Sequence, residues 1–239
     1  MKNKLNILGI MLLAVIAAAC GRSTVVEKLQ DDLEAYPEYS IILEDMKEEG
    51  TFFNDYYHKY KTIYGEKADG DSLAYRTEIT DWQKVRDKEY DKLAPYLGMV
   101  VASKSPDGEV SDTPQPPGYQ YVGDSRYGQW RSDSHGNSFW EFYGKFALMS
   151  HLFGMMGGPV YRNDYNDYRR YRNSGRPYYG KNNSYGTNGT LTKKTNPTFF
   201  QRKQATEAAR KQSFSNRVKQ RTRRSNMSGV RSRSRGFGK

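Results

Sequence analysis

Charge is distributed unevenly along this 239-residue chain, and this limits which parts can share one hydrophobic core. Residues 1–160 hold 17 Lys and Arg against 24 Asp and Glu, a net charge of −7. Residues 161–239 hold 21 against 3, a net charge of +18, so the formal total of +11 describes neither part. Only 36% of the residues are hydrophobic and the mean hydropathy is −0.92, which is too polar for one core over the whole length. We therefore expect a folded acidic part followed by a basic tail.

The N-terminus has the composition of a secretory signal. Lys2 and Lys4 precede an uncharged apolar run over residues 7–19. These 13 residues are fewer than the about 20 that a membrane-spanning helix needs, so we expect the segment to be cleaved. The run ends in Ala17-Ala18-Ala19-Cys20, followed by Gly21, and this resembles the lipobox of bacterial lipoproteins. The resemblance implies that a signal peptide, residues 1–19, is removed and that Cys20 is acylated.

Acylation of Cys20 would attach the protein to a membrane of the bacterial cell envelope. Gly21, rather than Asp, follows the cysteine, and by the same resemblance this favours the outer membrane where the cell has one, and otherwise the plasma membrane. Cys20 is the only cysteine, so it has no intramolecular disulfide partner, and acylation would consume a thiol that is otherwise free. Ala17 stands where Leu is usual, which leaves ordinary cleavage after an Ala-x-Ala site as the alternative.

The residue pattern of the acidic part predicts an α+β fold. We expect residues 20–35 to serve as anchor and tether and residues 36–104 to form a small domain. The spacing of Tyr39, Ile42, Leu43 and Met46 predicts a first helix between Pro37 and Gly50. Residues 52–64 and 73–85 predict a β-hairpin. A second helix, capped by Asp87 and ended near Pro95 and Gly98, precedes a strand over residues 99–102. We expect a small antiparallel sheet with both helices on one face.

Two further segments follow this predicted domain. Residues 105–137 are rich in Pro and Gly and predict a long loop, whose aromatic residues either pin it to the domain or form a stacking surface for sugar rings. Residues 138–158 predict an apolar helix that packs on the domain, docks on a partner or second copy, or lies in the membrane interface. The candidate membrane or partner contacts on this helix are Phe139, Trp140, Phe142, Phe146 and Phe153.

Residues 159–239 predict a long disordered basic tail, because they contain few aliphatic residues. Within the tail, residues 197–224 are expected to become helical on an anionic surface. We do not expect an exported chain to bind nucleic acid, which leaves anionic lipid, an anionic envelope polymer, or the protein's own acidic part as partners. The candidate anion-binding residues are Arg169, Arg170, Arg172, Arg221, Arg223, Arg224, Arg231, Arg233 and Arg235.

No catalytic constellation is recognisable in the sequence. His58 and His151 are isolated, and the adjacent side chains of Asp133, Ser134 and His135 cannot generally adopt the geometry of a catalytic triad. We therefore expect a non-enzymatic, lipid-anchored envelope protein without metal or cofactor, whose basic tail binds anionic lipid or polymer. The alternative is an accessory lipoprotein that binds or modifies cell-wall glycan through the aromatic residues between 119 and 143.

Overall fold

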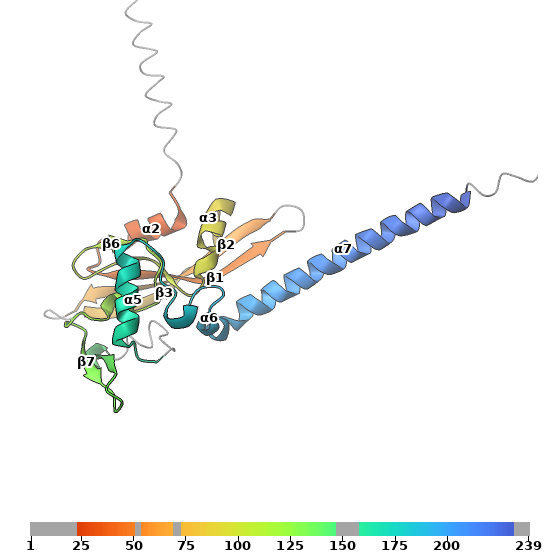
Figure 1. The fold of residues 1–239 in the computed structure, drawn as a ribbon. Helices are drawn as coiled ribbons and strands as arrows, with labels where there is room; N and C mark the ends of the chain where they lie inside the picture. Colours follow the sequence, from red (N-terminus) through yellow and green to blue (C-terminus); the bar gives the residue numbers. More distant parts are fainter. Residues whose placement is uncertain (1–22, 51–53, 69–72, 147–157, 232–239) are drawn as a thin grey trace, which may run out of the picture. The chain divides into compact units, whose positions relative to one another are not determined.

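The computed structural model describes residues 23–50, 54–68, 73–146 and 158–231, with the backbone alone for Lys145 and residues 223–231 (Figure 1). The chain falls into two compact units that divide between Thr192 and Lys193. The elements of the first unit are α2 (Val25–Asp32), β1 (Tyr39–Glu49), β2 (Asp55–Lys67), β3 (Leu73–Ile79), β4 (Gln83–Val85), α3 (Asp87–Leu93), β5 (Val100–Lys104), β6 (Val110–Ser111), β7 (Gly128–Ser132), β8 (Ser138–Phe142) and α5 (Arg162–Asn173). Short 3₁₀ helices are η1 (Ala94–Tyr96), η2 (Tyr119–Tyr121), η3 (Gly144–Phe146) and η4 (Lys181–Asn183).

An antiparallel sheet forms the centre of the first unit, in the strand order β3-β2-β1-β5-β6, with β4 also paired to β2. This confirms an α+β fold with an antiparallel sheet. The hairpin prediction is confirmed as well, because β2 and β3 pair from Lys61↔Ile79 to Lys67↔Leu73. A separate two-stranded sheet is formed by β7 and β8.

The first helix of the sequence prediction is wrong, because its residues form the central strand β1. Tyr39 to Leu43 are all buried, and since successive strand residues point to opposite faces, both faces of the sheet are covered here. The register shifts between Leu43 and Asp45, and Met46 beyond the shift is buried. A strand buried on both faces does not alternate between apolar and polar residues, and the shift produced a spacing that resembles that of a helix.

The second predicted helix and the strand after it are present. The helix α3 runs from Asp87 to Leu93, and the chain then passes through η1, which contains Pro95, to Gly98 with a φ of +73°. The capping residue differs from the prediction: Arg86 is the N-cap, and Asp87 lies inside the helix and accepts a hydrogen bond from its neighbour, Lys88. The strand β5 follows and pairs with β1.

Part of the predicted tether is also helical. Helix α2 begins after Thr24, whose hydroxyl accepts from the backbone N–H of Glu27 at 3.2 Å, while the Glu27 carboxylate accepts from the backbone N–H of Thr24 at 2.7 Å. This reciprocal capping box fixes the start of the helix. The tether therefore differs from the prediction, because residues 25–32 belong to the fold.

Two aromatic cores lie among the described residues of the first unit. One contains Ile42, Ile63, Val100, Tyr121 and Tyr127. The other contains Tyr119, Val122, Trp140, Val160, Tyr168 and Tyr178. Tyrosines of the 105–137 segment lie in both cores, which agrees with the interpretation that aromatic residues pin this loop to the domain.

The apolar helix predicted over residues 138–158 is wrong for its first part. Residues 138–142 form β8, in which Trp140 lies opposite Trp130 of β7. Bulky aromatic residues favour a strand as readily as one face of a helix, and the cross-strand partner decided between the two. Residues 147–157 of the predicted helix, including Phe153, lie outside the described residues.

The prediction of disorder is wrong for the start of the basic tail. Residues 162–173 form helix α5, which buries Tyr168 at 2% exposure, and Tyr178 and Tyr185 are buried after it. The prediction failed because it took aliphatic content as the measure of folding. Large tyrosine rings supply the buried area here instead.

The second unit consists mainly of α7 (Pro197–Arg231), which follows α6 (Thr190–Thr195) across the unit boundary. The sequence predicted a helix over residues 197–224 only on contact with a partner, whereas the structure carries a longer one in the isolated chain. Among the described residues, no helix combines the length and the apolar character needed to cross a membrane.

Candidate functional sites

The first candidate site is the basic helix α7. Its 35 residues correspond to a length of about 52 Å. The helix contains ten Lys or Arg residues and one acidic residue, Glu207. The basic residues are Lys203, Arg210, Arg217, Arg224 and Arg231, which recur every seven residues, together with Arg202, Lys211, Lys219, Arg221 and Arg223.

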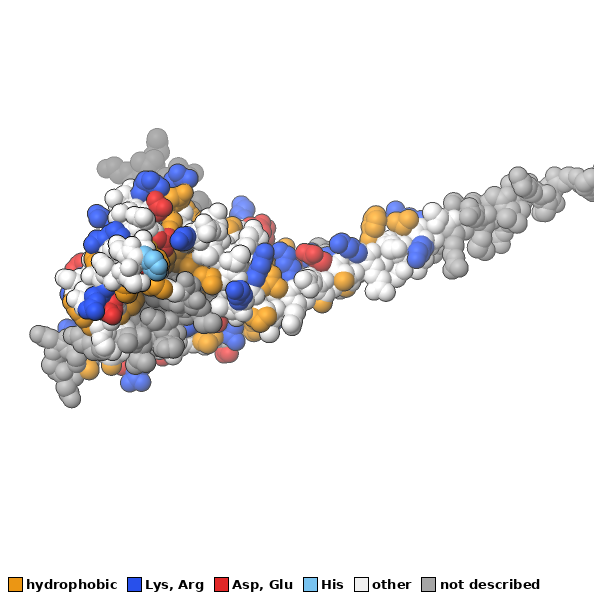
Figure 2. Space-filling model, turned by 60° about the horizontal axis from the view of Figure 1, so that its bottom comes forward, with side chains coloured by type: hydrophobic (Ala, Val, Ile, Leu, Met, Phe, Trp, Pro, Cys, Tyr) orange, Lys and Arg blue, Asp and Glu red, His pale blue; other side chains and the backbone are white. Residues whose placement is uncertain are grey.

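The seven-residue repeat places one positive side chain of α7 every two turns on nearly the same side, about 10.5 Å apart along the axis. All residues from 201 to 222 are exposed, including Phe214 at 69% and Val218 at 43%. Phe214 lies four residues after Arg210 and three before Arg217, so it shares their side of the helix. Figure 2 shows blue Lys and Arg side chains along the helix with single hydrophobic side chains among them.

The predicted anion-binding arginines fall into two groups in the structure. Arg169, Arg170 and Arg172 lie on α5 in the first unit, where Arg170 pairs with Asp167 at 2.8 Å and Arg172 with Glu109 at 2.9 Å. Arg221 is exposed on α7, and Arg223, Arg224 and Arg231 lie on the same helix in the part described by its backbone. Arg233 and Arg235 lie outside the described residues, as does Cys20.

The predicted membrane-contact residues lie largely against the first unit itself. Trp140 is 5% exposed in the second aromatic core, and Phe142 packs on both cores. Phe146 lies 4.9 Å from Tyr127 between ring centroids. Phe139 is half-buried, with its ring centroid 6.5 Å from that of Tyr161. These four residues do not form one exposed face, because β8 turns alternate residues inward.

The second candidate site is a polar groove of about 940 Å³ in the first unit. Three segments line it: the turn at residues 136–138, helix α5 between Arg162 and Tyr171, and residues 178–183. The lining combines amides, tyrosines and charged residues, namely Asn137, Asn163, Asn182, Asn183, Tyr161, Tyr171, Tyr178, Tyr179, Arg162, Arg170, Lys181, Asp164 and Asp167. We call it the α5 groove.

Asp164 connects the α5 groove to the core beneath it. Its Oδ2 accepts a hydrogen bond from the hydroxyl of Tyr119 at 2.6 Å, and its Oδ1 accepts one from the hydroxyl of Tyr178. Burial, together with Asp164, raises the pKa values of both tyrosines, so both remain hydrogen-bond donors at neutral pH. The carboxylate is therefore held in one orientation by two buried hydroxyls.

No known protein family, curated protein or solved structure matches this chain. Function must therefore be inferred from the chemistry of these sites. Among the described residues, no group of three or more His, Cys, Asp or Glu side chains is placed to hold a metal ion. In the exposed turn after β7, the Ser134 hydroxyl lies 3.3 Å from His135 Nδ1, but Asp133 accepts from Asn137 and from the backbone of His135, not from the imidazole.

Sequence reasoning missed a buried carboxylate, Glu38, which is fully inaccessible to solvent. Its Oε2 accepts from the Tyr127 hydroxyl at 2.6 Å, and its Oε1 accepts from the Tyr75 hydroxyl. Burial raises the pKa of Glu38 above its usual value, against the effect of these two hydrogen bonds. Only its position after Pro37 and before an apolar run marks Glu38 in the sequence, which gives no sign of a site.

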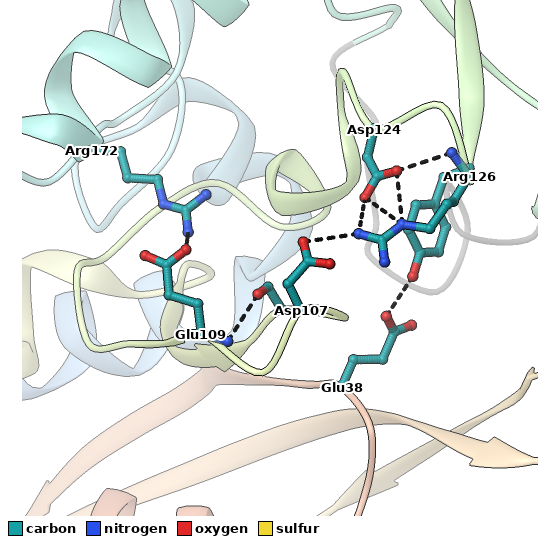
Figure 3. A network of polar contacts seen from close by, with 8 residues as sticks. Glu38, Asp107, Glu109, Asp124, Arg126 and Arg172 are labelled. Atoms are coloured by element: carbon teal, nitrogen blue, oxygen red, sulfur yellow. Dashed lines mark hydrogen bonds and ion pairs between the residues drawn. The ribbon is translucent and has the colours of Figure 1, made fainter.

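An exposed ion-pair network lies beside Glu38 (Figure 3). Arg126 pairs with Asp124 at 2.6 Å and with Asp107 at 3.0 Å. It directly precedes Tyr127 in the chain. The guanidinium therefore ties two loop segments together next to the tyrosine that holds Glu38. Because Glu38 is sealed from solvent and each of its oxygens already accepts a hydrogen bond, the arrangement is one of structural support.

Proposed function

We propose that the protein is a lipid-anchored, non-enzymatic protein of the bacterial cell envelope whose helix α7 binds the anionic surface of a membrane. The observation that carries the proposal is the composition and exposure of α7, with ten basic residues against one acidic residue on a long, exposed helix. Near an anionic leaflet each Lys or Arg contributes about 1 kcal/mol to binding, so micromolar affinity requires about eight of the ten basic side chains to be engaged.

The side chains of α7 favour a lipid surface over a dissolved polymer. Phe214 and Val218 are four residues apart, and both are exposed. Phe214 lies between Arg210 and Arg217 on the same side of the helix. An apolar ring between two cations suits a headgroup boundary, where the ring enters the acyl region and the cations contact phosphates. An anionic polymer could pair with the cations equally well, but it would provide no apolar environment in which the phenyl ring could be buried.

Vesicle cosedimentation tests this proposal with the chain from Gly21 onward, which retains every described residue and lacks the anchor. We expect binding to vesicles containing phosphatidylglycerol and none to vesicles of phosphatidylcholine. The triple variant K203Q/R210Q/R217Q should bind at least about tenfold more weakly. The control variant K67Q/R86Q/K88Q removes the same charge from exposed positions of the first unit that are not candidate anion-binding residues, and it should bind like the unaltered chain.

Three results would contradict the assignment of α7. Equal loss in both triple variants would mean that net charge alone matters. Binding to purified anionic wall polymer but not to vesicles would identify a polymer as the partner. Concentration-dependent self-association that disappears in K203Q/R210Q/R217Q, without vesicle binding, would identify the acidic first unit as the partner.

The anchor is tested separately in cells grown with a labelled fatty acid. Cys20 should carry the label, and Cys20→Ser should abolish labelling and slow removal of the signal peptide. Unchanged labelling in Cys20→Ser would contradict the lipoprotein assignment.

The alternative function, glycan binding through aromatic residues between 119 and 143, has less support, although Tyr143 is 38% exposed. Tyr119, Tyr121, Tyr127 and Trp140 are buried in the two cores. Trp130 is half-buried and lies under the guanidinium of Arg162, 3.8 Å from the ring centroid.

A further inference from the structure

We propose that the α5 groove is a binding site for an oligosaccharide of N-acetylated amino sugars. Its volume of about 940 Å³ lies at the upper end of ordinary ligand sites, large enough for several sugar rings. Nothing in the proposal depends on α7 or on the anchor, so it stands apart from the membrane function.

Unused amides in the α5 groove provide the polar recognition. Asn163, Asn182 and Asn183 are exposed, and their side chains form no hydrogen bond with any other described residue. Each side-chain amide offers a donor and an acceptor, which matches a sugar hydroxyl or an acetamido group, since both of those also donate and accept. Half-buried Tyr161, Tyr171 and Tyr179 line the same groove and supply ring surface for the apolar faces of sugars.

The segment that carries two of these amides has an uncommon backbone. Asn182 and Asn183 have φ values of +56° and +51°, in the left-handed region, which asparagine adopts more readily than most residues other than glycine. The segment is held from both ends: the Asn183 N–H donates to the carbonyl of Gly180 at 3.1 Å, and the Tyr185 N–H donates to that of Tyr179 at 2.9 Å. Two neighbouring residues in sparsely populated backbone conformations are typical of a functional site.

The charges of the α5 groove favour an uncharged ligand. Arg170 is paired with Asp167, and the Arg162 guanidinium lies over the ring of Trp130. The Lys181 ammonium lies over the ring of Tyr161, 5.9 Å from its centroid. Asp164 is held by two tyrosine hydroxyls. These groups are engaged with the protein itself, so the amides and the tyrosine rings, rather than an ionic contact, would select the ligand. This separates the groove from α7, whose binding would depend on charge and weaken with salt.

Calorimetric titration of the chain from Gly21 onward with chitotetraose tests the proposal. We expect saturable binding that is unchanged between about 0.05 and 0.5 M salt. Replacing both amides in N182G/N183G keeps the left-handed backbone accessible and should weaken binding at least about tenfold. The control N173G/N188G removes two exposed asparagines outside the groove lining and should bind like the unaltered chain.

Two further variants keep the outcome unambiguous. Asn163→Ala lies in helix α5, where alanine is favourable, and should also weaken binding if N182G/N183G proves to fold poorly. Deletion of residues 202–239 should leave chitotetraose binding intact. The proposal is overturned if the unaltered chain does not bind chitotetraose at millimolar concentration, if Asn163→Ala and a folded N182G/N183G both bind normally, or if the deletion abolishes binding.

Discussion

The backbone N–H of Val25 donates a hydrogen bond to Oε1 of Glu89 at 2.9 Å, and this joins the first turn of α2 to α3 across 64 residues of chain. Glu89 is buried, and further along α2 the Gln30 amide donates to Asp112 at 2.9 Å. Just beyond the helix, Leu33 is buried in the first unit. The described segment nearest Cys20 is thus attached to the folded unit by two hydrogen bonds and by the buried side chain of Leu33.

Glu89→Ala should release the start of α2. The substitution leaves the Val25 N–H without its protein partner, and the expected loss in unfolding free energy is about 1–3 kcal/mol. Glu89→Gln retains a carbonyl acceptor and should lose less. Urea unfolding measures the stability, and hydrogen exchange at Val25 measures the local opening. Unchanged exchange at Val25 in Glu89→Ala would show that this contact does not hold the helix.

His58 should make the fold sensitive to acid. Burial lowers the pKa of His58 from 6.5 to about 4, and its Nε2 has no hydrogen-bond partner among the described residues. The unfolded chain therefore binds the proton more readily than the folded chain, so stability falls as the pH drops from 6.5 through 4. For a pKa shift of this size, the total loss of unfolding free energy is roughly 3 kcal/mol.

His58→Phe should remove this acid dependence while keeping an aromatic ring against Tyr90, whose centroid lies 5.2 Å from that of His58. Urea unfolding across this pH range compares the variant with the unaltered chain. His135→Phe, at an exposed position, is the control and should leave the slope of unfolding free energy against pH unchanged. Identical slopes in His58→Phe and the unaltered chain would contradict the assignment.

Glu38 should have the opposite effect from His58 and make the fold less stable as the pH rises. Burial raises its pKa above the usual 4.5, so the folded chain holds the proton more tightly than the unfolded chain. Its contribution to stability is complete below pH 4.5 and is lost as the pH rises through the folded pKa. Glu38→Gln carries no charge at any pH, so its stability relative to the unaltered chain should increase over that rise. Glu34→Gln, at an exposed position, should show no such trend, and a pH-independent difference for Glu38→Gln would refute the prediction.

Two truncations should separate the folded part of the basic region from α7. Deletion of residues 202–239 removes side chains that are exposed throughout residues 202–222, and the melting temperature should stay within about 2 °C. Deletion of residues 161–239 also removes Tyr168 and Tyr178 and uncovers Trp140. Each buried aromatic side chain contributes about 1.5–3 kcal/mol, so this truncation should unfold the first unit. Equal melting temperatures would show that α5 contributes nothing to the core.

The parts of the fold that the sequence predicted correctly are those with strong local signals. Residues 73–85 alternate between apolar and polar side chains, and Pro95 and Gly98 mark the end of α3. The errors occurred where tertiary contacts decided the structure. Tyr39 to Leu43 became a strand because β2 and β5 flank it on both edges, and Trp140 entered a strand because Trp130 lies opposite. Neither partner is near enough in sequence to appear in a short window.

The two candidate sites differ in how far they could be foreseen. A count of charges was enough to locate the basic helix, since its residues are contiguous. The α5 groove combines a turn near Asn137, helix α5 and a loop around Asn182, and two of these segments were expected to be disordered. A tyrosine-rich chain with few aliphatic residues can still fold, because hydroxyls such as that of Tyr168, which donates to Gln115, satisfy the polar groups that its core buries.

The docking of α2 on the folded unit also limits how far that unit can lie from Cys20. If Cys20 carries acyl chains, only four backbone steps separate it from Thr24, the cap of the helix, and even a fully extended chain spans about 14 Å over that distance. The start of α2 would then stay within about 14 Å of the anchored cysteine, and the folded unit would travel with its membrane in two dimensions. A glycan that enters the α5 groove would have to come within one folded unit's length of that leaflet, because the short tether would not let the protein extend farther outward.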